Sequence, residues 1–454
     1  MSFCSGTRQE LRQRSDSRQK AESLGDFRYG NARFLPRFLK TARPPQRESE
    51  AKCGRRIMDT EQIRHEFPIL DRQIGGEPLV YLDSAATYLK PRAVIDAVCD
   101  CYRQTAGTIG RGVHVLAEDA VSRFDDARET IADFINADAD EIVFVRNATE
   151  AINLVASSLP AGTSVLGSAG EHHSNLLPWR RGLRFHGIPL ADDGHVNLES
   201  VEPLLQAVNP KLLTTSTISN AFGNLHPVDP LTRIAHAAGC DVLLDANQSV
   251  AHHRMDVRAL DCEYLCFSGH KLGGPTGIGV LYAKRDRLEL LQPRLFGGGM
   301  VESVDSDGYE LADLPMRLES GTASFEGVIG LSAACEFFEA IGLESLAEHE
   351  RQLTRQLHEG LTSIPRVTVR GPKLGTERGA IVSFHIQGLE AHGAARMLSN
   401  RANICVRSGF HCAQLAHESR GWRPTVRASF GVYNTSDEVD VLLNALRQIT
   451  LNLG

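Results

Sequence analysis

The segment YLCFSGHK, residues 264–271, joins a short apolar run to a lysine. The run predicts a buried strand that ends near Phe267. Burial and neighbouring cations lower the pKa of a lysine amine, as a Schiff-base nucleophile requires, although the pattern alone also fits a solvated loop lysine. Ser268 and His270 add a hydroxyl and an imidazole, and glycines follow at 273, 274 and 277. We therefore favour a cofactor-binding role for Lys271.

Similar apolar runs recur along the chain and alternate with amphipathic stretches. Strands are predicted at 141–145, 164–166, 212–215, 241–244, 263–267 and 279–282, with helices such as 120–134 and 230–238 between them. Repeated alternation of strand and helix predicts an α/β fold with a mainly parallel sheet covered on both faces. After about residue 327 the pattern changes to helices at 329–341 and 343–361 and strands at 367–370 and 381–386, which predicts a smaller α+β domain.

The composition restricts the class of protein. The 454 residues are enough for two or three domains, and no run approaches the roughly 18 uncharged apolar residues of a membrane span. Residues 1–57 carry fourteen Lys and Arg against six Asp and Glu, a net charge of +8, whereas the remainder carries 35 against 50, a net charge of −15. An acidic body argues against nucleic-acid binding, which depends on clustered Lys and Arg.

Residues 1–57 are rich in Arg, Ser and Gln and lack apolar periodicity, so we expect a disordered basic leader. Transit peptides share this composition but avoid acidic residues, and the equal alternative is that Met58 is the true start and the leader an artefact of the gene sequence. The ten cysteines show no secreted spacing, so we expect free thiols and a cytoplasmic location, with organellar import through the leader left open.

Asp245 directly follows the predicted strand 241–244, at the end of a strand where α/β proteins bind ligands. A carboxylate there could equally cap the next helix. Paired with a Schiff-base lysine it gains a sharper role, because pyridoxal phosphate acts as an electron sink when an acidic partner keeps its ring nitrogen protonated. Gln248, three residues on, is placed to hydrogen-bond the phenolic oxygen of that cofactor.

Two further segments follow predicted strands. Thr149 lies in RNATEA, residues 146–151, which opens a helix, and the free N–H groups of a helix start favour phosphate, although an ordinary helix cap is the commoner reason for such a segment. His172 lies in GEHHSN, residues 170–175. Adjacent histidines point apart and no third ligand is evident, so we expect no metal site and favour a ring stacked on an aromatic cofactor.

The segment RSGFHCA, residues 407–413, carries a cysteine unlike the others. Five cysteines lie in apolar surroundings and are expected in the core: Cys240, Cys262, Cys266, Cys335 and Cys405. Cys412 instead lies in a glycine-containing loop beside His411 and near Arg407, an electropositive setting that produces a nucleophilic thiol. Arg427, fifteen residues later, suits bidentate binding of a carboxylate.

Together these segments resemble class V pyridoxal-phosphate enzymes, specifically the group II cysteine desulfurases related to SUF-system and CsdA-type enzymes. The resemblance covers about residues 58–454, with its most specific matches at 81–86, 170–175, 268–271, 407–413 and 427–435. It implies fold type I, as in aspartate aminotransferase. A large domain, 83–335, would hold a mainly parallel seven-stranded sheet, and a small α+β domain, 58–82 with 336–454, would carry the cysteine loop.

The resemblance also implies roles toward pyridoxal 5'-phosphate. Lys271 would bind the cofactor as a Schiff base and move protons to and from the substrate. Asp245 would pair with the pyridine nitrogen. Five further residues would surround the phenolic oxygen, the ring and the phosphate: Gln248, His172, Thr149, Ser268 and His270. Thr322 would reach the phosphate of a partner subunit, which implies a homodimer.

On the substrate side, the resemblance implies L-cysteine, with L-selenocysteine as a further candidate. Asn220, also counted with the cofactor-binding residues, and Arg427 would orient the substrate carboxylate, with His114 and Arg407 at the access to the site. Cys412 would take the sulfur as a persulfide, release alanine, and pass the sulfur to an acceptor protein for iron–sulfur assembly or another thiolation pathway.

The chain departs from the family pattern near the nucleophile. Phe410 stands where the family has the first of two histidines, residues 109–110 replace a histidine before RGVH, and Leu415 replaces a proline. Loss of an imidazole could raise the pKa of the thiol. Other class V reactions therefore stay open: selenocysteine lyase, cysteine sulfinate desulfinase, aminotransferase or epimerase.

A non-catalytic scaffold is the alternative of a different class. The joint presence of Lys271, Asp245, Gln248, His172 and Cys412 argues against it. A dinucleotide-binding fold is not expected, because no GxGxxG follows a predicted strand.

Overall fold

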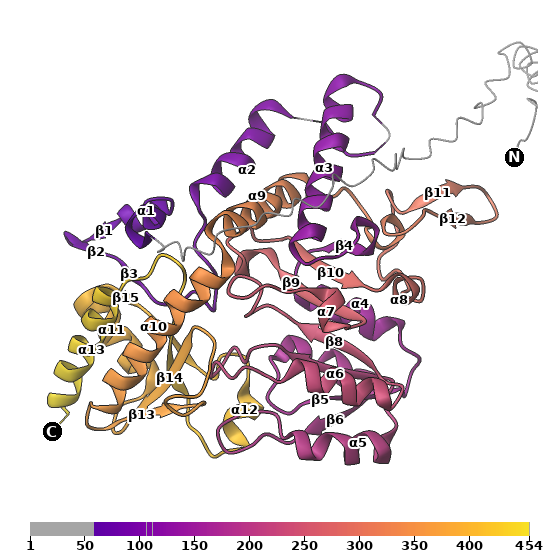
Figure 1. The fold of residues 1–454 in the computed structure, drawn as a ribbon. Helices are drawn as coiled ribbons and strands as arrows, with labels where there is room; N and C mark the ends of the chain where they lie inside the picture. The colour runs from indigo at the N-terminus through magenta and orange to yellow at the C-terminus, as the bar shows by residue number, and fades with distance from the viewer. Residues whose placement is uncertain (1–58, 106, 111, 454) are drawn as a thin grey trace, which may run out of the picture. The chain divides into compact units, whose positions relative to one another are not determined.

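The computed structural model describes residues 59–453 apart from 106 and 111, so the prediction of a disordered leader lies outside the described residues. The described residues belong to one compact unit. Within its described part, two larger sheets organise the chain, one of seven strands and one of four (Figure 1).

The seven-stranded sheet has the order β4-β10-β9-β8-β7-β5-β6. Its strands are β4 (Ile142–Val145), β5 (Ser164–Ser168), β6 (Arg184–Ile188), β7 (Leu212–Ser216), β8 (Asp241–Asp245), β9 (Tyr264–Ser268) and β10 (Gly279–Ala283). Neighbours pair in parallel except β10, which is antiparallel to both β4 and β9. The predicted mainly parallel sheet is confirmed. Of the strands in this sheet, β6 was not predicted, because its polar sequence RFHGI lies at the sheet edge and carries no apolar run.

Helices cover both faces of this sheet. They are α3 (Val115–Phe134), α4 (Ala148–Ser158), α5 (Val201–Val208), α6 (Val228–Ala237), α7 (Val257–Leu260), α8 (Arg285–Leu288) and α9 (Phe325–Ile341). Along β8, Leu244 belongs to the core cluster that includes α3 and α9, whereas Leu243 belongs to the cluster that includes α4. Successive side chains thus enter two cores, as a sheet buried on both faces requires.

The four-stranded sheet is antiparallel, with the order β13-β14-β17-β16. Its strands are β13 (Val367–Arg370), β14 (Ile381–Ile386), β16 (Arg407–Gly409) and β17 (Thr425–Ser429), accompanied by α10 (Leu343–Thr362), α11 (Ala391–Ala402), α12 (Gln414–Glu418) and α13 (Ser436–Leu451). These elements share a core cluster of their own. β15 (Ile404–Cys405) pairs in parallel with β3 (Val80–Tyr81), which joins the start of the described chain to its last third. The domain boundaries given above stay a prediction.

The remaining elements lie outside the two sheets: α1 (Thr60–Arg64), α2 (Arg92–Gln104), the short pair β1 (Gln73–Ile74) and β2 (Glu77–Pro78), and the hairpin β11 (Val301–Val304) with β12 (Tyr309–Leu311). None of the helices in the described part of the chain is long and apolar enough to span a membrane. The strand directions bring the carboxyl ends of β4, β8 and β9 to one edge of the large sheet. This edge is where ligands bind in α/β proteins.

Candidate active site

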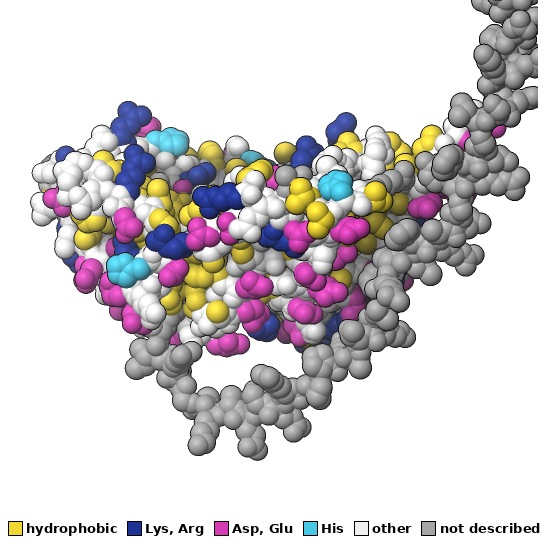
Figure 2. All heavy atoms as spheres, turned by 90° about the horizontal axis from the view of Figure 1, so that it is seen from above, with side chains coloured by type: hydrophobic (Ala, Val, Ile, Leu, Met, Phe, Trp, Pro, Cys, Tyr) yellow, Lys and Arg dark blue, Asp and Glu magenta, His cyan; other side chains and the backbone are white. Residues whose placement is uncertain are grey.

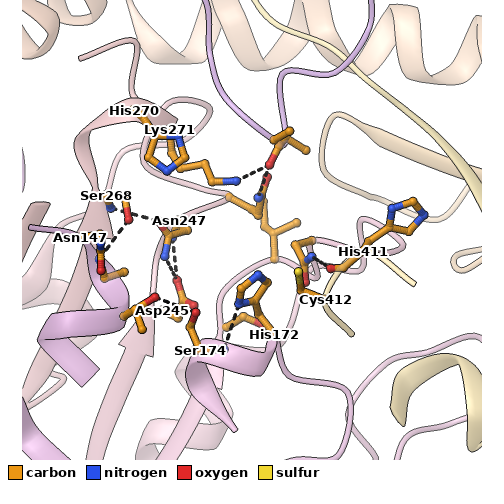
Figure 3. A pocket seen from close by; sticks show the side chains of 18 of the residues that line it. Asn147, His172, Ser174, Asp245, Asn247, Ser268, His270, Lys271, His411 and Cys412 are labelled. Atoms are coloured by element: carbon orange, nitrogen blue, oxygen red, sulfur yellow. Dashed lines mark hydrogen bonds between the residues drawn. The ribbon is translucent and has the colours of Figure 1, made fainter. Parts of the chain in front are cut away.

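A cavity of about 320 Å³ opens at this edge of the sheet. Its volume lies within the range of small-molecule sites. Eleven of the thirteen predicted site residues line it: Thr149, His172, Asn220, Asp245, Gln248, Ser268, His270, Lys271, Arg407, Cys412 and Arg427. Residues from segments almost 280 positions apart in the sequence therefore meet around one space (Figure 3).

Lys271 ends the short turn that follows β9, and its Nζ donates a hydrogen bond to the backbone oxygen of Ala85. Gln248 Nε2 donates to the same oxygen at 3.0 Å. Burial, together with the nearby Arg427 guanidinium, lowers the pKa of the Lys271 amine to about 7. An amine with this pKa is partly uncharged near neutral pH, which is the form that attacks a carbonyl carbon.

Asp245 is buried at the end of β8. Its Oδ1 accepts hydrogen bonds from the backbone N of Asn247 at 3.0 Å and from Asn247 Nδ2 at 2.6 Å. Burial raises the pKa of this carboxyl, so a cationic partner in the cavity would restore its ionised form. A protonated ring nitrogen is such a partner.

Asn247 is a site residue that the sequence analysis missed. Its Oδ1 accepts from the backbone N of Ser268 at 2.9 Å, while its amide holds Asp245. The side chain therefore ties the end of β8 to the end of β9. Its position between Asp245 and Gln248, in a segment already singled out, was the available signal.

The start of α4 has groups suited to bind a phosphate. Asn147 caps this helix and accepts from the backbone N of Glu150 at 3.0 Å, and Ser268 Oγ accepts from the backbone N of Ala148 at 3.0 Å. The hydroxyls of Thr149 and Ser174 are 2.8 Å apart beside it. Hydroxyl groups at the positive end of a helix favour an anion.

His172 supplies a neutral ring. Its Nδ1 accepts from the backbone N of Ser174 at 3.0 Å. Burial lowers the pKa of the imidazole to about 4, with a contribution from the nearby Lys271 amine. The ring therefore carries no charge at neutral pH, as stacking on an aromatic cofactor requires. In Figure 3, His172 and Lys271 border the same space.

Cys412 is exposed and lines the cavity. Figure 3 places its side chain beside His172. Cys240, Cys262, Cys266 and Cys335 are buried, as predicted. Cys405 is only partly buried, so its prediction as a core thiol was wrong: the two-residue strand β15 is paired only with the equally short β3.

Two arginines flank the cavity and share one carboxylate. Arg427 is buried, and its guanidinium donates to the backbone oxygen of Asn220 at 2.7 Å and contacts Asp83 Oδ1 at 3.3 Å. Arg407 Nε contacts Asp83 Oδ2 at 3.3 Å. The segment 81–86 matches the family pattern, but the sequence alone predicted no role for Asp83. The structure shows that this carboxylate bridges the two arginines.

Two predicted site residues lie outside the cavity lining in this chain. His114 is exposed and caps α3, where its Nδ1 accepts from the backbone N of Ala117 at 3.3 Å. Thr322 is exposed in the segment between β12 and α9. The roles given to both residues stay predictions.

The side chains present fit pyridoxal 5'-phosphate. They combine an amine of lowered pKa, a buried carboxyl that needs a cationic partner, a neutral ring and an anion seat around one cavity. Among residues 59–105, 107–110 and 112–453, no group of three or more His, Cys, Asp and Glu is arranged to hold a metal ion.

Comparisons with known proteins all point to one family. The pattern of the Aminotransferase class-V family matches residues 80–442. A cysteine desulfurase of Cronobacter sakazakii is 41% identical over 406 residues, covering 87% of this chain and 99% of the relative. The solved cysteine desulfurase of Thermococcus onnurineus NA1 is similar with a TM-score of 0.82 at 36% identity, over 87% of this chain and 98% of that one. The cysteine desulfurase CsdA of Escherichia coli is similar with a TM-score of 0.80 at 34% identity, over 88% and 100%.

Proposed function

The chain belongs to the aminotransferase class-V family, and on that premise we propose that it is a pyridoxal-phosphate-dependent cysteine desulfurase. It converts L-cysteine to L-alanine and keeps the sulfur on Cys412. The observation that carries the proposal is the joint presence, around one cavity, of the Lys271 amine, the Asp245 carboxyl and the exposed Cys412 thiol.

The residues that line the cavity would hold the cofactor. Lys271 would bind its aldehyde carbon and Asp245 would pair with its ring nitrogen. Gln248 would bind its phenolic oxygen, and His172 would lie against the ring. The start of α4, with Thr149, Ser268 and His270 in the cavity lining, would hold its phosphate. When bound, pyridoxal phosphate supplies an electron sink that allows carbon–hydrogen and carbon–sulfur bonds of the amino acid to break.

The chain's own residues supply binding, proton transfer and the nucleophile. Arg427 and Asn220 orient the substrate carboxylate, since a guanidinium binds a carboxylate through two parallel hydrogen bonds. The Lys271 amine, with a pKa of about 7, is suited both to accept the α-proton and to return a proton.

Cys412 takes the sulfur. Its Sγ attacks the substrate sulfur, so an S–S bond forms as the substrate carbon–sulfur bond breaks. The substrate carbon gains a proton in its place. One thiol and one cysteine become one persulfide and one alanine, and no outside oxidant or reductant is needed. A second thiol later releases the persulfide sulfur.

The proposal is tested by incubating the purified, cofactor-loaded protein with L-cysteine and a reductant and measuring alanine and sulfide together. Equal amounts of the two products are expected. Parallel incubations with L-selenocysteine, L-cysteine sulfinate and a 2-oxo acid with an amino donor separate the alternative class V reactions. Turnover of one of these without turnover of cysteine would overturn the proposal.

A homodimer forms part of the proposal. Exposed apolar side chains gather where α2 ends and α3 begins: Tyr102, Val113, Val115 and Leu116. Figure 2 views this side of the molecule, where hydrophobic side chains lie open between charged ones. A second copy would cover them and accept the exposed Thr322 at its phosphate site. Sedimentation of the protein beside Val115→Asp tests this, with dimer expected for the first and monomer for the second.

The persulfide requires an acceptor protein, and we place the reaction in the cytoplasm. The exposed thiol of Cys412 must be reduced to take sulfur, which suits a reducing compartment. Iron–sulfur assembly or another thiolation pathway would consume the sulfur. Fractionation of cells that express the tagged full-length chain tests the location.

A further inference from the structure

The turn that carries Cys412 has an uncommon backbone conformation. The backbone N of Ala413 donates to the oxygen of Phe410 at 2.9 Å, and the two residues between them, His411 and Cys412, have φ angles of 53° and 55°. Positive φ at both central positions is the pattern of a type I′ turn, which favours glycine and asparagine. Neither residue here is of that kind, so contacts around the turn must hold it in this shape.

Loops of the large sheet hold the turn from one side. Asn220 Nδ2 donates to the backbone oxygen of His411 at 2.6 Å. The backbone N of His173 donates to the backbone oxygen of Cys412 at 2.8 Å. These bonds fix both carbonyl groups of the turn but leave the side chain of His411 to other partners.

A chain of buried side chains holds the turn from the other side. His411 Nε2 lies 2.9 Å from the hydroxyl of Thr425 on β17, and His417 Nε2 on α12 lies 3.3 Å from the same hydroxyl. His417 Nδ1 lies 3.1 Å from the backbone oxygen of Ala413. Thr425 and His417 have no exposed surface, and His411 is 7% exposed. This series of hydrogen bonds therefore ends at Ala413, the residue that closes the turn.

The direction of each hydrogen bond in this series of side chains follows from the groups at its two ends. The oxygen of Ala413 can only accept, so His417 Nδ1 carries the hydrogen and His417 Nε2 accepts from the Thr425 hydroxyl. The hydroxyl oxygen then accepts from His411 Nε2. Within the described residues His411 Nδ1 is buried without a partner, which fits an unprotonated nitrogen better than an N–H. Burial lowers the pKa of both imidazoles, so both are neutral.

Phe410 packs against His417. Phe410 brings no hydrogen-bonding group to the turn, and its ring lies edge-on to His417 at 5.4 Å. The ring of Phe222 packs on His417 at 4.7 Å. His417 therefore reaches the Cys412 turn from α12 and supplies a hydrogen-bonding ring where residue 410 has none.

We propose that Thr425 and His417 are positioning residues that, through His411 and Ala413, hold Cys412 in the orientation needed to take sulfur. Neither residue lines the cavity, so neither is placed to contact substrate or cofactor directly. The inference rests on the proposed function, because it assumes that Cys412 is the sulfur-accepting thiol.

The test compares Thr425→Val with Thr425→Ser in the cofactor-loaded protein. Valine keeps the shape of threonine but removes the hydroxyl that both imidazoles share, whereas serine keeps the hydroxyl. We expect Thr425→Val to lower kcat for alanine release about ten-fold, with KM for cysteine and the cofactor absorbance unchanged, because a misplaced nucleophile loses effective concentration. Thr425→Ser is expected to restore most of kcat.

A second readout does not depend on turnover. The rate at which iodoacetamide alkylates Cys412, followed by mass spectrometry, should change in Thr425→Val and return in Thr425→Ser. If Thr425→Val does not fold, His417→Asn replaces it, since asparagine keeps the bond to the Ala413 oxygen but is too short to reach Thr425. The same loss of kcat is expected.

The outcomes separate the two claims. Unchanged kcat and unchanged alkylation in the folded variants would overturn the positioning role while the proposed function stands. A kcat that falls equally in Thr425→Val and Thr425→Ser, or falls together with cofactor absorbance, would also overturn it, because general damage to the fold explains that result. An unmodified protein that releases no alanine, with alkylation altered in Thr425→Val alone, would leave the turn contacts standing and overturn the function.

Discussion

The surroundings of Glu171 strongly raise the pKa of its buried carboxyl. It is 1% exposed, and its oxygens accept from Asn175 Nδ2 at 2.8 Å and from the backbone N of Ser216 at 2.9 Å. Burial nevertheless raises its pKa to about 7, with the nearby Asp245 acting in the same direction. The folded protein therefore binds this proton more tightly than the unfolded chain, whose pKa is close to 4.5.

This difference predicts a pH-dependent loss of stability. A carboxyl whose pKa is raised in the folded state favours folding below pH 4.5 and loses that contribution as pH rises through about 7. Between pH 5 and pH 8, the cofactor-free protein should lose up to about 3 kcal/mol of unfolding free energy relative to Glu171→Gln. Urea unfolding at the two pH values measures this. A constant difference between the two proteins would contradict the raised pKa.

Asp83 sets the positions of two arginines at the substrate side of the cavity. In Asp83→Asn both guanidinium groups lose their counter-charge, so Arg427 is held less firmly for the substrate carboxylate. We expect KM for cysteine to rise about ten-fold with a smaller change in kcat. Steady-state kinetics of Asp83→Asn beside the exposed control Asp71→Asn measure this. An unchanged KM would remove Asp83 from substrate binding.

Most residues that line the cavity with predicted roles could be named from the sequence, whereas the residues that hold them in place could not. Lys271, Asp245 and Cys412 lie in segments whose residue types fit a known chemistry. Asn247 and Asp83 act through other side chains, and their partners lie up to 344 positions away in the sequence. Such contacts exist only once the strand ends have been brought together.

At the scale of elements, a largely buried ion pair between Arg128 and Glu319 links α3 to the segment that precedes α9. Arg128 on α3 donates to both oxygens of Glu319 at 2.8 Å and to the backbone oxygen of Ile142 on β4. Glu319 also accepts from the backbone N of Phe144 at 2.7 Å. The pair therefore joins α3, β4 and the segment that leads to Thr322.

Removal of one partner should lower the free energy of unfolding, because it leaves the charge of the other partner buried and unpaired. For Glu319→Ala we expect a loss of about 3 kcal/mol of unfolding free energy. Arg146→Ala removes the exposed i,i+4 pair with Glu150 and serves as the control, with an expected loss below about 0.5 kcal/mol. Urea unfolding measures both. Equal losses of unfolding free energy would show that the buried pair stabilises the fold no more than the surface pair does.

The elements whose bounds were predicted from the sequence agree with the structure to within a few residues, since their apolar periodicity is strong. The strands at 367–370 and 381–386 have the predicted bounds, and α3 begins five residues earlier than predicted. That earlier start reflects the His114 cap, a side-chain acceptor that hydrophobic periodicity does not reveal. β6 was missed for the converse reason: a polar edge strand is defined by its pairing with β5.

For the whole molecule, the family resemblance predicted the arrangement that the structure shows. The seven-stranded sheet, mainly parallel, could not be counted from periodicity alone, because β6 has no apolar signal. Contacts with a second copy could not be derived from one chain, so the roles of His114 and Thr322 depend on the proposed homodimer.

Residues 1–57 are expected to be dispensable for catalysis. The cavity lining runs from Ala85 to Arg427, and the leader differs from the body in charge and composition. A protein that starts at Met58 should keep the cofactor absorbance and the rate of alanine release of the full chain. Side-by-side assays of the two proteins measure this. Loss of cofactor binding in the shorter protein would contradict the expectation.

The most direct test of the central claim is alanine release from L-cysteine under reductant by four proteins: the unmodified chain, Lys271→Ala, Cys412→Ala and Cys405→Ala. Cys405 is the control, since it is a partly buried cysteine outside the cavity lining. We predict release by the unmodified chain and by Cys405→Ala, and none by Lys271→Ala or Cys412→Ala. Continued cysteine turnover in Cys412→Ala, with Lys271→Ala inactive, would contradict sulfur transfer to Cys412.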